Sequence, residues 1–116
     1  MRHHLYIITG ASRGLGLGMA RQLVQPGHSL VCIARNGNHD LAALAAATPA
    51  CSLEQWSQDF ADGGLVAAAR LRKWLHGADG QAFATATLIN NAAVLPAIAP
   101  LADTRAADVP LVLRVG

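Results

Sequence analysis

Four short stretches rich in apolar residues recur along the chain, and the first two are continuous. They cover residues 5–8, 29–34, 52–56 and 84–89. A continuous apolar run is typical of a strand that is buried on both faces of a parallel sheet. Glu54 and Gln55 interrupt the third stretch, which indicates a strand at the edge of the sheet. The pattern therefore predicts four strands.

Between these strands the apolar residues recur with the spacing of a helix. The predicted helices cover residues 15–25, 40–47 and 63–75. A last helical stretch is expected from about Thr104, and Pro110 marks either its true start or a kink. Strands that alternate with helices predict one α/β domain, in which a parallel sheet carries helices on both faces.

The most specific stretch is the glycine-rich turn between the first strand and the first helix. There the backbone N–H groups and the helix dipole favour a phosphate or pyrophosphate. Gly16 is predicted to face the sheet, so that helix and strand approach closely, while Gly10 and Gly14 let the backbone approach a ligand. The alternative, a strand-to-helix turn that is merely rich in glycine, fits the flanking residues less well.

Composition narrows the classes of function. The chain has 116 residues, of which 53% are hydrophobic and 14% charged, so it can bury a core as one domain. The net charge of +2 comes without a basic cluster, which argues against nucleic acid as a partner. Cys32 and Cys51 lack the spacing of metal ligands, and adjacent His3 and His4 point to opposite faces of a strand, so we expect no metal site. Reduced cysteines and the lack of a signal or membrane segment predict a cytoplasmic protein.

Three motifs then coincide along the chain. Thr9-Gly10-x-x-x-Gly14-x-Gly16 follows the first strand, Asp59 the third, and Asn90-Asn91-Ala92-Ala93 the fourth. In this order they resemble the short-chain dehydrogenase/reductase family across essentially the whole chain. The resemblance implies a doubly wound Rossmann sheet with strand order 3-2-1-4. It also implies that residues 1–116 are the N-terminal, NAD(P)-binding portion of a longer domain.

The resemblance also implies the residues that bind the cofactor. The loop for the pyrophosphate and ribose comprises Gly10, Ser12, Arg13, Gly14, Leu15 and Gly16. Asp59 and Phe60 would lie against the adenine, and Asn90 and Ala92 near the adenosine ribose and the sheet interior. Ala93 stands where the family usually has glycine, which narrows the approach of the backbone to the cofactor slightly.

Arg35, at the end of the second strand, indicates which cofactor binds. An NAD site typically has an acidic residue there for the ribose hydroxyls, whereas a 2′-phosphate requires positive charge. With Arg13 on the glycine loop nearby, Arg35 favours NADP(H) over NAD(H). The alternative is that Arg35 is a solvated loop residue.

The residues for catalysis are absent from this sequence. The family uses a Tyr as proton donor and a Lys four residues later, but the only Tyr here is Tyr6 and the only Lys is Lys73. The position of the family's supporting Asn aligns with Gly116. The chain therefore reads as the cofactor-binding half of an oxidoreductase that acts on a carbonyl or alcohol substrate and forms homo-oligomers. We also expect the fourth strand to be an unpaired edge, which favours poor solubility or self-association.

Other functions fit less well. A non-catalytic NADP(H) sensor or scaffold remains the main alternative, because it would need the same loop and no catalytic pair. A methyltransferase is disfavoured, since Arg35 stands where an acid would bind the ribose of S-adenosylmethionine. A P-loop NTPase is excluded because no Gly-Lys-Ser/Thr follows the loop. No residue indicates the substrate.

Overall fold

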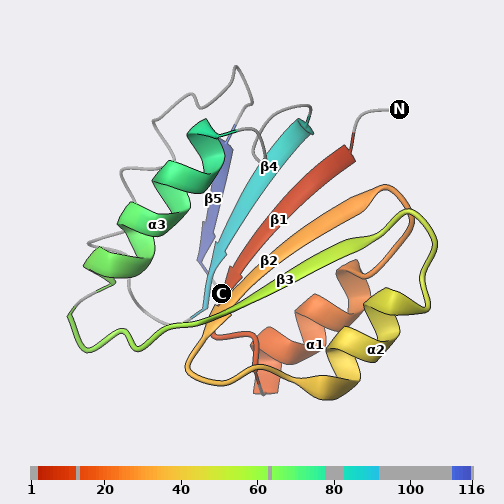
Figure 1. The fold of residues 1–116 in the computed structure, drawn as a ribbon, viewed down its shortest axis with the longest axis horizontal. Helices are drawn as coiled ribbons and strands as arrows, with labels where there is room; N and C mark the ends of the chain where they lie inside the picture. The colour runs from red at the N-terminus through yellow and green to blue at the C-terminus, as the bar shows by residue number, and fades with distance from the viewer. Residues whose placement is uncertain (1–2, 13, 63, 78–82, 92–110, 116) are drawn as a thin grey trace.

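The strands of the protein form one parallel sheet in the order β3-β2-β1-β4-β5 (Figure 1). The computed structural model describes residues 3–12, 14–62, 64–77, 83–91 and 111–115. In chain order the elements are β1 (His3–Thr9), α1 (Gly14–Leu23), β2 (His28–Ala34), α2 (His39–Ala46), β3 (Ser52–Ser57), α3 (Leu65–His76), β4 (Phe83–Asn90) and β5 (Leu111–Val115).

The predicted strand order 3-2-1-4 is confirmed, and the structure adds a fifth strand. Residues 86–90 of β4 pair with residues 111–115 of β5, so the expectation that β4 is an unpaired edge is wrong. The self-association and poor solubility that we expected were based on that unpaired edge, and this reason for them therefore no longer holds. A helix was expected from about Thr104. Residues 104–110 lie outside the described residues, and residues 111–115 form the strand β5 instead of a helix.

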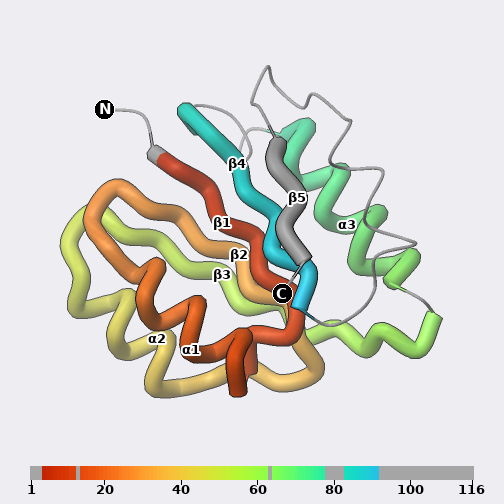
Figure 2. The backbone as a smooth tube through the Cα atoms, turned by 180° about the vertical axis from the view of Figure 1, so that it is seen from behind, coloured from red at the N-terminus to blue at the C-terminus, as the bar shows by residue number. Residues whose placement is uncertain are grey.

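The helices lie on both faces of the sheet, as predicted. Seen from behind in Figure 2, α1 and α2 lie in front of the sheet, and α3 lies on the opposite face. Alternate residues of the strands therefore enter two separate cores. The core under α3 includes Leu5, Ile7, Val31, Ile33, Leu71 and Leu88, and the core under α1 and α2 includes Ile8, Ala20, Leu30, Cys32 and Leu41.

The start of α3 is held by an acidic side chain. The carboxylate of Asp62 accepts hydrogen bonds from the N–H groups of Gly64 and Val66, each at 2.9 Å. The Val66 N–H in particular holds the pKa of Asp62 below its usual range. The carboxylate therefore caps N–H groups that have no partner within the helix.

Glu54 connects the edge strand β3 to α3. One carboxylate oxygen accepts a hydrogen bond from the indole N–H of Trp56 at 3.2 Å, and the other accepts one from Trp74 at 3.1 Å. The guanidinium of Arg70 lies over the Trp56 ring, 4.3 Å from its centroid. Trp74 is half-buried against the core under α3.

Replacing Glu54 with alanine is therefore expected to lower the free energy of unfolding by about 1 kcal/mol, because two indole N–H groups lose their acceptor. Urea unfolding followed by tryptophan fluorescence measures this change. Glu54→Gln, which keeps one acceptor oxygen, should fall between the wild type and the alanine variant. Equal stability of all three proteins would show that the two hydrogen bonds contribute nothing to the fold.

Candidate functional site

The glycine-rich loop follows β1 at the carboxyl edge of the sheet, where α1 begins (Figure 1). Gly10 has φ +71° and Gly14 has φ +61°, a region that residues with a side chain rarely adopt. The N–H of Gly10 donates to the carbonyl of Ile33 at 2.8 Å, which anchors the loop to the end of β2. The turn therefore depends on glycine at these two positions.

Gly16 and Gly14 differ in what surrounds them. A Cβ added to Gly16 would overlap the carbonyl oxygen of Gly10 and would lie 2.7 Å from Nδ2 of Asn91. A Cβ added to Gly14 would have no atom within 4 Å among the described residues. The prediction that Gly16 permits a close approach of helix and strand is confirmed. Gly14, the first residue of α1, instead faces a space that no described residue fills, in which an anion could approach the helix N-terminus.

A buried hydrogen bond joins the ends of β1 and β4. The hydroxyl of Thr9 donates to Oδ1 of Asn90 at 2.9 Å, and both residues are buried. Thr9 and Asn90 are also paired in the sheet register. This bond brings the motif after the first strand together with the motif after the fourth, which the sequence separates by eighty-one positions. Ser12 lies half-buried in the glycine loop, whereas Leu15 is 67% exposed.

Arg35 is exposed and directly follows β2. Its backbone carbonyl accepts a hydrogen bond from the hydroxyl of Ser57 at 2.7 Å. In the part of the chain that the structure describes, the ion pair is between Arg21 and Asp40, at 3.9 Å, and the Arg35 guanidinium has no ion-pair partner. The positive charge is therefore available to a ligand at the carboxyl edge.

Asp59 and Phe60 lie on the segment between β3 and α3. The carboxylate of Asp59 accepts a hydrogen bond from the N–H of Ala61 at 2.9 Å, and the residue is exposed. Phe60 is half-buried and packs against the core under α3. Two further candidates, Arg13 and Ala92, lie outside the described residues, as do Ala93 and Gly116.

Sequence reasoning did not identify the side chains that support this site. Gln55 and Ser57 of β3 hydrogen-bond to the backbone of the loop after β2. The only signal for them was the polar character of the third strand, which was interpreted as a sign of an edge. Asn38, whose side chain accepts a hydrogen bond from the N–H of Leu41 at 2.9 Å and caps α2, was also missed.

The chain's single tyrosine and single lysine lie on opposite sides of the sheet. Tyr6 is on β1 and packs on the side of α1 and α2, with its ring 4.9 Å from that of His28. Lys73 is on α3, which covers the other face of the sheet. The two side chains are therefore separated by the sheet, and they do not form the proton-donating pair that the resemblance implies.

The remaining chemistry of the described residues is limited. They contain no cluster of three or more His, Cys, Asp or Glu side chains that could hold a metal ion. Cys32 and Cys51 are free thiols, and burial raises the pKa of Cys32 to about 12, so this thiol stays protonated at neutral pH. None of the helices described is both long and apolar enough to cross a bilayer.

Comparison with known proteins identifies the family. The model of the short chain dehydrogenases matches residues 4–115. Short-chain dehydrogenase RED3 of Pyricularia oryzae is 44% identical over 45 residues, which make up 38% of this chain and 18% of the length of that protein. No solved structure matches the chain significantly. Because the family match extends over nearly the whole chain, and the sheet order and glycine loop agree with it, the protein belongs to the short-chain dehydrogenase family.

Proposed function

We propose that this chain binds NADP(H) in preference to NAD(H), as the cofactor-binding portion of an oxidoreductase that acts on a carbonyl or alcohol substrate. The observation that carries the proposal is the pairing of two features at one edge of the sheet. One is a glycine loop whose Gly14 faces a space at a helix N-terminus that no described residue fills, and the other is the exposed Arg35, which has no ion-pair partner among those residues.

The residues of the loop fit a dinucleotide. The N-terminus of α1 would hold the pyrophosphate, because its first N–H groups have no partner within the helix and the dipole favours an anion. The packed Gly16 keeps α1 close to β1, so these N–H groups stay directed at the site. The remaining assignments follow the family pattern, with Ser12, Arg13 and Leu15 in the loop, Asp59 and Phe60 at the adenine, and Asn90 and Ala92 at the ribose.

Arg35 would contact the 2′-phosphate. A guanidinium forms bidentate, charge-assisted hydrogen bonds with a phosphate, which an uncharged pair of ribose hydroxyls cannot match. When bound, the cofactor supplies or accepts the hydride. The role of this chain's own residues is to bind and orient it, since Tyr6 and Lys73 lie on opposite faces of the sheet.

Titration of the 116-residue chain with NADPH and NADH tests the proposal. We expect NADPH to bind roughly tenfold more tightly or better, the factor that about 1.4 kcal/mol of differential binding produces. Quenching of the fluorescence of Trp56 and Trp74, or calorimetry, measures both affinities. Equal affinities would contradict the assignment of Arg35, and a failure to bind either dinucleotide would contradict the whole proposal.

A non-catalytic NADP(H) sensor or scaffold is the second candidate, and the separation of Tyr6 from Lys73 favours it. Both candidates require NADPH binding, so activity is the measurement that separates them. An oxidoreductase should consume NADPH when it is offered aldehydes and ketones. Tight binding of NADPH without any turnover across such a panel would favour the sensor.

A further inference from the structure

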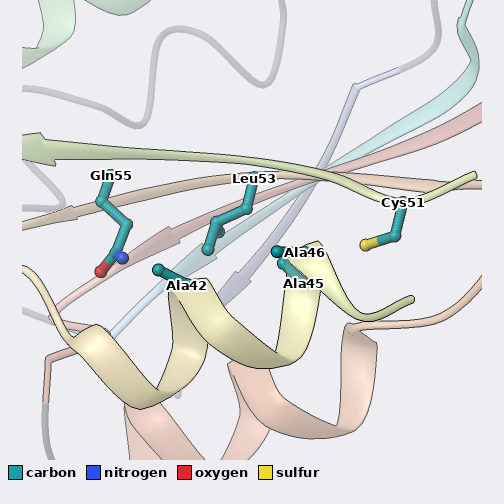
Figure 3. A pocket seen from close by; sticks show the side chains of 6 residues that line it. All are labelled: Ala42, Ala45, Ala46, Cys51, Leu53 and Gln55. Atoms are coloured by element: carbon teal, nitrogen blue, oxygen red, sulfur yellow. The ribbon is translucent and has the colours of Figure 1, made fainter. Parts of the chain in front are cut away.

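Two side chains of β3 hold the backbone of the loop that carries Arg35. The amide of Gln55 contacts Asn38 twice, because its Oε1 accepts from the Asn38 N–H at 2.7 Å and its Nε2 donates to the Asn38 carbonyl at 3.0 Å. Figure 3 shows the Gln55 side chain pointing away from β3 toward α2, on the same side as Leu53 and Cys51. The Gln55 side chain thereby hydrogen-bonds to both the N–H and the carbonyl of Asn38.

The other end of the loop is held from the end of the same strand. The hydroxyl of Ser57 donates to the carbonyl of Arg35 at 2.7 Å, and the N–H of Gln58 donates to the carbonyl of Ala34 at 2.7 Å. The backbone from Arg35 to Asn38 is therefore attached to β3 at both ends. The Arg35 side chain itself takes no part in these contacts, so its backbone is fixed while its guanidinium faces solvent.

We propose that Gln55 and Ser57 are positioning residues that set the preference of the site for a 2′-phosphate. The inference rests on the proposed function, in which Arg35 contacts that phosphate. A loop that is ordered before the ligand arrives loses less conformational entropy on binding, and the gain appears as affinity. The pyrophosphate is held separately by the glycine loop and α1. Loosening the Arg35 loop therefore lowers the affinity for the 2′-phosphorylated cofactor alone.

The test compares NADP⁺ with NAD⁺, which differ only in the 2′-phosphate. Gln55→Leu removes both contacts to Asn38, and we expect the affinity for NADP⁺ to fall about threefold to tenfold, the worth of one or two net hydrogen bonds, with that for NAD⁺ unchanged. Ser57→Ala should act in the same direction, and Ser57→Thr, which keeps the hydroxyl, should restore the wild-type ratio. Ser52→Ala is the matched control, because Ser52 donates to Ser29 at the opposite end of β3.

A second measurement shows whether the effect passes through Arg35. In an Arg35→Ala background, Gln55→Leu should cause no further loss of NADP⁺ affinity, since the contact that it positions is already absent. Amide hydrogen exchange should also show faster exchange of the Asn38 N–H in Gln55→Leu, because this N–H loses its acceptor. An equal loss of NADP⁺ affinity with and without Arg35 would overturn the inference.

The outcomes separate this inference from the proposed function. If the wild-type chain binds NADP⁺ and NAD⁺ equally, the proposed function has failed and the inference fails with it. If the wild type prefers NADP⁺ but Gln55→Leu and Ser57→Ala keep the same ratio, only the positioning role is wrong. Should Gln55→Leu fail to fold, which circular dichroism would show, Ser57→Ala alone decides the question.

Discussion

Replacing Gly16 with alanine is expected to lower the free energy of unfolding by about 1–3 kcal/mol or more and to abolish cofactor binding. The added Cβ would overlap the carbonyl oxygen of Gly10 and crowd Nδ2 of Asn91. The first of these is backbone, so relief requires α1 to move away from β1. That movement withdraws the first N–H groups of the helix from the loop in which the pyrophosphate would lie. Urea unfolding and NADPH titration measure the two effects.

Gly18 provides the matched control on the same helix. A Cβ at this position would meet no atom within 4 Å among the described residues, and Gly18 is exposed. Gly18→Ala is therefore expected to raise the free energy of unfolding by about 0.4–1 kcal/mol, because alanine reduces the conformational entropy of the unfolded chain and favours a helix. If both variants changed stability in the same direction, the close contact of Gly16 would not be the cause.

Replacing Arg35 with aspartate is expected to lower the affinity for NADPH relative to NADH at least about tenfold. The substitution removes the proposed partner of the 2′-phosphate and places a carboxylate, which would repel the phosphate, in the same position. The same carboxylate can accept hydrogen bonds from the two ribose hydroxyls of NADH, so the affinity for NADH should hold or rise. The ratio of the two dissociation constants is the quantity to measure.

Arg72→Asp controls for the change in net charge. Arg72 is exposed on α3, which covers the face of the sheet opposite to α1 and α2. If the variant at Arg35 acted only through the overall field of the protein, the two aspartate variants would shift the ratio equally. An unchanged ratio in Arg35→Asp itself would show that Arg35 is a solvated loop residue.

The parts of the fold that the sequence predicted are those with local signals. The glycines at positions 10, 14 and 16 constrain their own backbone and the adjacent helix, and their spacing alone indicated a close strand-to-helix contact. The four strands before residue 91 followed from short stretches rich in apolar residues, of which the first two are continuous. Even the edge position of β3 was predicted correctly, because Glu54 and Gln55 would be costly in a strand buried on both faces.

What the sequence did not predict depends on partners that lie far away along the chain. Residues 111–115 contain five positions, too few to distinguish the period of a strand from that of a helix, and their assignment to β5 depends on pairing with β4. Gln55 hydrogen-bonds to a residue seventeen positions earlier, and Thr9 to one eighty-one positions later. Neither contact leaves a pattern in the residues next to it.

Successive side chains of β3 point to opposite faces of the sheet and make different contacts on each. The register in which β3 pairs with β2 therefore decides whether these contacts form. Gln55 supports the Arg35 loop on the side of α2, and Glu54 and Trp56 contact α3 on the other. A shift by a single residue would exchange the two faces, so the tie to α3 and the support of Arg35 would be lost together. If Arg35 binds the 2′-phosphate as proposed, misaligned molecules would therefore be both less stable and less selective for NADP(H) over NAD(H).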